Sequence, residues 1–599
     1  MIYRVLRLVG VRLGLAIVFL CQFGAAWAFE AALQLTREDE PLRESLSQTS
    51  LVMTAKREEV TQPLDILAAA QADYGTLVSA LYARGYFGPV IKILIDGREA
   101  ADIPPLARLA SVRQVLILID TGPAFRLGRA RIGPLDPDTE LPDGFRPGEP
   151  ASVGVISDAA EAGIDAWRDR SYAKARVARQ SITADHARAQ LNVDLRLDPG
   201  RAATFGKVNV PNESNVRPDR IRRIAGIPRG KPFDPVELER AAKRLRRTGA
   251  FSAVTIREAD ELTPEGNLDI DLELTDAKPR RFGFGAEIES IEGLTLSGYW
   301  MHRNLFGGAE RLRIETEVAG LGGDTEGVDT TLRISLTRPS TFDSDTDLYA
   351  LIEVEQLDEE LFNSDQVTVG AGISHYYSEE LEGRIGLGYR YSDVTDELGS
   401  RTFTHLTLPF SITWDKRDSE LDATEGFYLS MEGLPYYGLD GSEKGARGYL
   451  DARGYRTLGD SEIVLATRLQ FGTIIGSSLA GTPSDLLFLS GGSGTVRGQS
   501  YQSLSIRTGT ARTGGRSFIG IAGETRFPVT KNFGGVLFYD VGYIGRNSFP
   551  DDSGDWHSGA GLGVRYKTAF GPIRFDVAVP VSGPDTSGFE FYIGIGQAF

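Results

Sequence analysis

From about residue 278 to its end, the chain is a succession of short segments in which apolar and polar residues alternate. In the first of these segments, Phe282, Phe284, Ala286 and Ile288 occupy every second position, and charged residues or glycines fill the positions between them. A period of two predicts β-strands with one apolar face and one polar face. About sixteen such segments, each roughly 20 residues long with its turn, fit the tilted strands of a closed transmembrane barrel. They start near residues 281, 294, 311, 330, 347, 366, 382, 403, 427, 446, 462, 517, 535, 558, 573 and 590.

A large soluble β domain would show the same alternation, but other layers of the domain would have to cover all the apolar faces. A closed barrel needs no such layers, because lipid covers its outside and no strand edge is left unpaired. We therefore expect residues 278–599 to form a sixteen-stranded antiparallel transmembrane β-barrel.

The first 28 residues have the pattern of a signal peptide. Arginines precede an apolar run over residues 13–20, and Ala26 and Ala28 supply small residues just before a cleavage point. An uncleaved anchor helix is the alternative, but the apolar run is short for a membrane span. Cleavage would also remove Cys21, the one cysteine of the chain, so we expect no disulfide in the mature protein.

Residues 29–277 mix helical and strand patterns and contain a weak internal repeat. Three times a helical segment leads to an aromatic residue and then to a strand, and these aromatics are Tyr86, Tyr172 and Phe251. A spacing of about 80 residues indicates repeated small domains. The third repeat is the clearest and has the order β-α-α-β-β. We expect three α+β units with this order, over residues 29–120, 121–199 and 200–277.

A loop rich in Gly, Ser and Thr, residues 476–516, interrupts the strand pattern of the barrel. Loops of this length are usually functional or disordered. Its centre contains Val496, Arg497 and Gly498. An arginine side chain cannot lose its proton in a protein. If the loop folds inward, Arg497 therefore needs a carboxylate partner.

Three acidic residues on the strands after the loop are candidates for this partner. Glu524, Asp540 and Asp576 each lie on the strand face opposite the apolar one, which points them into the barrel. A guanidinium group can form paired hydrogen bonds with such carboxylates. The same parity would arise if these acids only lined a water-filled lumen, and Val-Arg-Gly also occurs on solvated loops. Parity therefore permits the pairing of Arg497 with Glu524, Asp540 or both, without establishing it.

Charge and motif content exclude several classes of function. The net charge of −17 disfavours a nucleic-acid-binding protein, which needs a basic surface. The five histidines are scattered, and no pair of them has the spacing of metal ligands. No serine motif or phosphate-binding glycine motif occurs in a suitable context. We therefore expect no enzymatic activity, no metal and no cofactor.

These features together resemble the POTRA-barrel superfamily of outer-membrane assembly and secretion proteins. Val496-Arg497-Gly498 is similar to the signature of the sixth extracellular loop of that superfamily, and the strand segment 538–542 is similar to its F-x-D-x-G motif. The segment 571–576 and the terminal Phe599 are similar to its last motifs. Three repeats, rather than one, two or five, resemble most the TamA branch, from the translocation and assembly module.

The resemblance implies a location in the outer membrane of a Gram-negative cell, with the repeats in the periplasm. It implies a factor that helps to insert or translocate β-barrel clients such as autotransporters, together with a TamB-like partner that spans the periplasm. It also implies a role in supplying phospholipid to the outer membrane. Ile595 and Phe599 would then carry the targeting signal and belong to the seam between the first and last strands.

Two positions depart from the pattern of the superfamily. Gln499 stands where an aromatic usually follows Arg-Gly, so we expect less apolar packing at the loop tip. Gln597 stands where an apolar residue is common near the end of the chain. Two other functions remain open: a two-partner secretion pore, which exports an unfolded partner protein, and a passive porin, which would not need about 250 periplasmic residues.

Overall fold

The computed structural model describes residues 29–105, 107, 109–289, 293–323, 327–459, 461–569, 571–584 and 588–599. The predicted signal peptide, with Cys21, lies outside these residues. The chain forms two compact units. The first runs to Phe205 and includes residues 230–235 and 261–268, and the second contains residues 206–229, 236–260 and 269–599. Among the described helices, none is both long enough and apolar enough to cross a membrane.

The N-terminal repeat is a four-stranded sheet with the strand order β1-β4-β2-β3 and three α-helices. Alternate residues of β4, Val115, Ile117 and Ile119, are buried against the apolar faces of the helices, where Leu46 and Leu77 are fully buried. The elements are β1 (Glu30–Leu35), α2 (Glu40–Thr49), α3 (Leu51–Arg57), α4 (Pro63–Tyr82), β2 (Val90–Ile95), β3 (Arg98–Glu99), η1 (Ala100–Asp102) and β4 (Gln114–Asp120). This repeat thus has one helix more than we predicted.

The middle repeat has one α-helix where the sequence led us to expect two. It consists of β5 (Arg126–Gly133), α5 (Val153–Asp169), β6 (Arg176–Asp185) and β7 (Gln190–Asp198), with the strand order β5-β7-β6. The segment where the other helix was expected contains five prolines between residues 134 and 150. Proline lacks the backbone N–H group and clashes with the preceding helical turn. The predicted β-α-α-β-β order is therefore wrong for this repeat.

The third repeat has the predicted β-α-α-β-β order. It consists of β8 (Thr204–Asn209), α6 (Pro218–Ala225), α7 (Pro235–Arg247), β9 (Phe251–Glu258) and β10 (Asn267–Asp276), with the strand order β8-β10-β9. Helix α7 is attached to a barrel turn, because Arg244 donates from Nε and Nη2 to the two carboxylate oxygens of Asp345, at 2.8 and 2.7 Å.

The recurring aromatics follow residues with a left-handed backbone. Tyr86 comes directly after Gly85 (φ +86°), and Tyr172 comes directly after Ser171 (φ +71°). Phe251 comes two residues after Gly249 (φ +68°). A left-handed residue ends a helix and redirects the chain. The repeat seen in the sequence is therefore a helix end that turns the chain toward the next strand.

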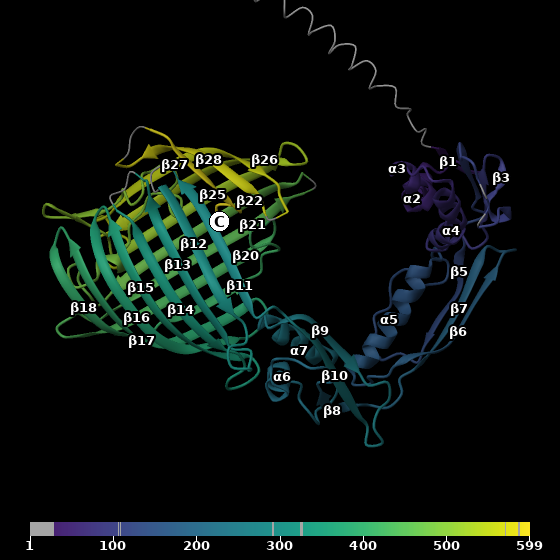
Figure 1. Cartoon of the computed structure of the whole chain (residues 1–599), viewed down its shortest axis with the longest axis horizontal. Coiled ribbons are helices and arrows are strands. Elements are labelled where there is room, and N and C mark those ends of the chain that lie inside the picture. Colours follow the sequence, from purple (N-terminus) through teal and green to yellow (C-terminus); the bar gives the residue numbers. More distant parts are fainter. Residues whose placement is uncertain are drawn as a thin grey trace, which may run out of the picture. The chain divides into compact units, whose positions relative to one another are not determined.

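The second unit is dominated by a closed antiparallel barrel with sixteen strand positions (Figure 1). β18 and β19 share one position, since both lie between β17 and β20. The interruption falls at Leu408-Pro409, where proline cannot donate to the ladder. The sequence prediction of the barrel is confirmed. Its strands are β11 (Arg280–Glu289), β12 (Gly293–His302), β13 (Arg311–Leu321), β14 (Asp329–Arg338), β15 (Thr346–Glu359), β16 (Phe362–Tyr376), β17 (Leu381–Asp396), β18 (Gly399–Thr407), β19 (Phe410–Asp415), β20 (Gly426–Leu439), β21 (Gly445–Leu458), β22 (Ile463–Ile475), β25 (Ser517–Pro528), β26 (Phe533–Gly545), β27 (Asp555–Tyr566), β28 (Ile573–Ser582) and β29 (Glu590–Ile595).

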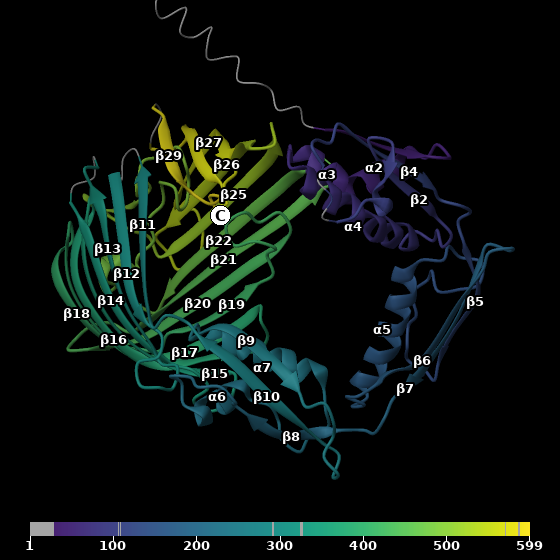
Figure 2. The same ribbon diagram turned by 45° about the vertical axis from the view of Figure 1, so that its right-hand side comes forward.

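The seam between the first and last strands is short. Among the residues that the structure describes, β29 pairs with β11 at two positions, Ile288 with Ile593 and Glu289 with Tyr592, whereas β26 and β27 pair at twelve. The last strand ends at Ile595, four residues before Phe599. Gly596 has a φ of +94° and turns the chain away from the strand. In the two views of Figures 1 and 2, the chain end lies among the barrel strands.

Candidate functional site

The loop between β22 and β25, residues 476–516, folds into the barrel. It contains a short helix, η2 (Ser484–Leu486), and two short strands, β23 (Ile506–Thr508) and β24 (Ala511–Thr513). Phe488 and Leu504 of the loop form an apolar cluster with Ile474 and Phe518 of the barrel wall. Val496 is fully buried and Arg497 is 2% exposed. The sequence alone allowed either an inward-folded loop or a solvated loop. The structure shows the inward-folded loop.

Arg497 contacts all three of the acidic residues that strand alternation places on the inner face of the barrel. Its Nε donates to Oδ2 of Asp540 at 2.7 Å, and its Nη2 donates to Oδ1 of Asp540 at 2.9 Å. Its Nη1 donates to Oε1 of Glu524 at 2.6 Å and lies 3.6 Å from Oδ2 of Asp576. The Asp540 contact is the two-point arrangement that a planar guanidinium favours. The structure thus pairs Arg497 with both Glu524 and Asp540.

The backbone and the wall of the barrel hold Arg497 in this place. The centre of the Phe538 ring lies 3.6 Å from the guanidinium carbon of Arg497, which allows a cation–π interaction. The backbone N–H of Arg497 also donates to Oδ2 of Asp540 at 3.1 Å. Gly498 has a φ of +88°, and a Cβ atom there would lie 2.6 Å from the carbonyl oxygen of Val579. Glycine is therefore required directly after Arg497, because the loop touches the backbone of β28.

Gln499, where the superfamily usually has an aromatic, is fully buried. Its side-chain Nε2 donates to the carbonyl oxygens of Ser558 at 2.8 Å and Ser582 at 2.9 Å. These two serines belong to the adjacent strands β27 and β28. The polar residue therefore replaces apolar packing with two hydrogen bonds that connect the loop to the wall.

Two arginines that the sequence analysis did not select surround the carboxylates. Nε of Arg526 donates to Oε2 of Glu524 at 2.9 Å. Arg565 donates to both carboxylate oxygens of Asp576, with Nη2 to Oδ2 at 3.2 Å. Strand parity could have found Arg526, which lies two residues after Glu524 and hence on the same face. It could have placed Arg565 inward as well, but no local signal showed which acid it would meet.

The loop is also anchored to the opposite part of the wall. Asp485, in η2, forms a buried ion pair with Arg390 of β17. The hydroxyl of Tyr501 donates to Oε1 of Glu359 at 3.1 Å, at the end of β15. No local pattern predicted these contacts, because they join residues far apart in the chain. The loop therefore crosses the lumen instead of lying against one side.

Phe599 and Ile595 are placed on opposite faces of the wall. Ile595 is 65% exposed on the outer face of β29. Phe599 is buried in an apolar cluster with Ala423, Tyr455, Ala466 and Ala522. Phe599, which the resemblance places with Ile595 at the seam, thus packs inside the barrel, beyond the end of β29.

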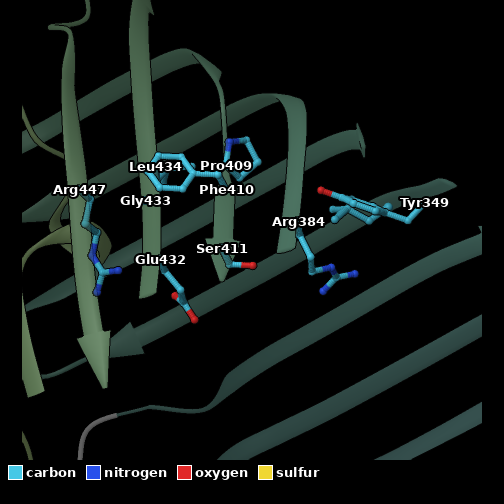
Figure 3. Close-up of a pocket in the computed structure, with 10 residues that line it drawn as sticks. Tyr349, Arg384, Pro409, Phe410, Ser411, Glu432, Gly433, Leu434 and Arg447 are labelled. Atoms are coloured by element: carbon cyan, nitrogen blue, oxygen red, sulfur yellow. The ribbon is translucent and has the colours of Figure 1, made fainter. Parts of the chain in front are cut away.

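A pocket lies at the inner wall on β15, β17, β19, β20 and β21 (Figure 3). It has a volume of about 320 Å³. Arg384 and Arg447 lie on opposite sides of it, with Ser411 and Glu432 between them. Within the described ranges, no group of three or more His, Cys, Asp or Glu residues could hold a metal ion. The pocket adds charged surface to the lumen.

A closed barrel whose lumen is crossed by its own long loop, preceded by α+β repeats, defines a class of outer-membrane proteins. Residues 304–599 match the Omp85 superfamily domain, and residues 203–274 match the POTRA family, described as a surface antigen variable number repeat. Over these residues the barrel of this chain is similar to the Omp85 superfamily domain. The protein is an outer-membrane β-barrel protein with a periplasmic POTRA region.

Two curated relatives are similar to this chain at low identity. The outer membrane protein assembly factor BamA of Neorickettsia risticii (strain Illinois) is 22% identical over 463 residues, which cover 72% of this chain and 60% of the relative. Outer envelope protein 80, chloroplastic, of Arabidopsis thaliana is 24% identical over 430 residues, which cover 65% of this chain and 55% of the relative. The matched part is thus little more than half the length of either relative.

The fold is also similar to a solved structure. BamA from Haemophilus ducreyi lacking POTRA domains 1–3 superposes with a TM-score of 0.61 at 18% identity. The match covers 79% of this chain and 99% of that chain. At this identity the likeness supports the fold, a barrel preceded by POTRA domains.

Proposed function

We propose that this protein is an outer-membrane assembly factor that helps β-barrel clients, such as autotransporters, to enter the membrane. The observation that carries the proposal is the seam, where β29 and β11 pair at two positions within the described part of the chain. The edge of a strand that opens at such a seam can accept a strand of another chain. The curated relative in Neorickettsia risticii is itself named an assembly factor.

The Arg497 loop is proposed to support this activity by fixing the shape of the barrel near the seam. Arg497 contacts Asp576 of β28, and the backbone N–H of Gly498 donates to the hydroxyl of Tyr592 in β29 at 3.0 Å. Tyr592 is one of the two β29 residues that pair with β11. The loop therefore touches one of the two strands that form the seam.

The finer assignment is also a proposal. Three periplasmic repeats, over residues 29–120, 121–199 and 200–277, favour the TamA branch of the superfamily. Such a protein would act with a TamB-like partner that spans the periplasm, and it would contribute to phospholipid supply to the outer membrane. Tyr86, Tyr172 and Phe251 would mark equivalent positions of the three repeats.

A deletion strain tests the proposal. Without this protein, the amount of folded autotransporter in the outer membrane should fall, and the full-length gene should restore it. Purification from native membranes should recover a TamB-like protein. If autotransporter levels are unchanged while a secreted partner protein is lost from the medium, the chain is instead a two-partner secretion pore.

A further inference from the structure

We infer that Arg526 and Arg565 are positioning residues that couple the Arg497 loop to the end of the last strand. Both lie on the inner face of the barrel, Arg526 on β25 and Arg565 on β27. Each contacts a carboxylate next to Arg497 on one side and the terminal segment 596–599 on the other. The inference deepens the proposed function, but the contacts that carry it do not depend on that function.

The first connection runs through Glu524. One carboxylate oxygen of Glu524 accepts from Arg497 at 2.6 Å, and the other accepts from Arg526 at 2.9 Å. The remaining donors of Arg526 point to the terminal segment and its surroundings. Nη2 donates to the carbonyl oxygen of Phe599 at 3.0 Å, and Nη1 donates to the carbonyl oxygen of Ala423 at 3.1 Å. Arg526 thus connects the acid that holds the loop to the residues that hold the chain end.

The second connection runs through Asp576 and is parallel to the first. Asp576 lies 3.6 Å from Nη1 of Arg497 and accepts hydrogen bonds from Arg565. Nε of Arg565 donates to Oε1 of Gln597 at 2.7 Å. The amide of Gln597 in turn donates to Asp422 at 2.9 Å, on the turn between β19 and β20. Gln597, which departs from the usual apolar residue, therefore has a defined polar role.

The charges of these two connections balance and are all buried. Three arginines face three carboxylates, and each of the six residues is at most 6% exposed; they are Arg497, Arg526, Arg565, Glu524, Asp540 and Asp576. A buried charge that loses its partner is strongly unfavourable. Hydrogen-bond networks of this kind also respond as a unit, so removing one member changes the environment of the others. Displacement of Arg497 should therefore disturb the contacts of Arg526 and Arg565 with the chain end.

The terminal segment matters because it directly follows the last strand, which forms the seam with β11. β29 has six residues, all of which pair with β28, and among the described residues it meets β11 at two positions. The backbone N–H of Gly596 donates to the carbonyl oxygen of Pro572 at 2.7 Å, and that of Gln597 donates to Leu421 at 2.9 Å. Loss of the side-chain contacts of Phe599 and Gln597 would leave mainly these bonds. The docked loop therefore stabilises the last strand, and by linkage the docked chain end stabilises the loop.

Reciprocal perturbation tests this coupling in the purified full-length protein in detergent. The first measurement is the rate at which an added protease cuts the loop 476–516. Phe599→Ala and Arg526→Gln should each raise this rate about fivefold or more, the lower end of typical coupling between sites. Arg526→Lys should restore part of the protection, because it keeps the charge but not the planar donors. The second measurement is the maleimide labelling rate of an Ala598→Cys variant, which Arg497→Ala should raise by a similar factor.

Matched variants control for general loosening of the barrel. Tyr299 and Phe599 each have an arginine next to the aromatic ring. The guanidinium carbon of Arg313 lies 4.1 Å from the centre of the Tyr299 ring, and that of Arg526 lies 5.8 Å from the centre of the Phe599 ring. Arg333 on β14 forms an ion pair with Glu353, as Arg526 does with Glu524. Tyr299→Ala and Arg333→Gln should change both rates less than about twofold, below the range of typical coupling.

The inference is overturned if Phe599→Ala leaves the loop as protected as in the unaltered protein and Arg497→Ala leaves the Ala598→Cys labelling rate unchanged. If Arg526→Gln does not insert, as judged by heat-dependent gel mobility, Phe599→Ala and the labelling measurement still decide the question. Coupling without any change in autotransporter assembly would count against the proposed function and in favour of the inference. Loss of assembly in Arg497→Ala with no coupling would support the proposed function and overturn the inference.

Discussion

The guanidinium of Arg497 and the carboxylate of Asp540 form a two-point contact inside the barrel, with N–O distances of 2.7 and 2.9 Å. The two residues are 43 positions apart, one on a glycine-rich loop and the other on a strand. Each is at most 2% exposed. Their contact fixes where the loop crosses the lumen.

Replacement of Arg497 by Ala should release the loop while the barrel still inserts. Removal of one member of a buried ion pair costs about 3–5 kcal/mol, because the other charges lose their partner. The loop should become accessible to protease in intact cells, and assembly of autotransporter clients should fall. Arg497→Lys should rescue only part of this loss, since an ammonium group cannot reproduce the two-point contact.

A second arginine of the same loop serves as the control. Arg512 donates to Glu360 at 2.9 Å, but this pair is largely exposed. Exposed ion pairs contribute about 0–1 kcal/mol, so Arg512→Ala should leave loop protection close to that of the unaltered protein. Equal effects of Arg497→Ala and Arg512→Ala would show that burial of the ion pair has no special role.

Gly498→Ala should destabilise the docked loop. A non-glycine residue at φ +88° is strained by about 1–3 kcal/mol, and its Cβ would collide with the backbone of Val579. Gly494→Ala is the matched control, because no atom lies within 4 Å of a Cβ atom placed there. Protease access to the loop should rise for Gly498→Ala and stay constant for Gly494→Ala. Equal protection in the two variants would contradict the close approach of the loop to β28.

Gln499→Phe, which restores the common aromatic, should lower the thermal stability of this barrel. The substitution removes the donors to the carbonyl oxygens of Ser558 and Ser582, and an unsatisfied buried acceptor costs about 1–3 kcal/mol. The temperature at which the folded band is lost on a gel measures the effect. A rise in that temperature would mean that apolar packing outweighs the two hydrogen bonds.

A fragment of residues 29–277 should be soluble without the barrel and give the circular dichroism spectrum of a mixed α/β protein. The first repeat has its own buried core, as does the second. A disordered or purely helical spectrum would contradict independent folding of these repeats.

Much of the fold could be predicted because strand alternation is a local property. Each strand carries its apolar face in its own sequence, so the number of strands and the inward side of Glu524, Asp540 and Asp576 followed from parity alone. The helix count of the middle repeat was wrong, although the five prolines between residues 134 and 150 were visible in the sequence. That error came from treating the three repeats as equivalent.

The sequence by itself determined the barrel, the position of the long loop and the face of each strand residue, because all of these depend on periodicity over a few neighbours. Only the tertiary structure decided which acids Arg497 meets and that Arg526 connects Glu524 to the end of the chain. It also decided that Phe599 turns inward from β29. These contacts join distant segments across a closed barrel, where buried charges must find partners, and no local pattern specifies the pairing.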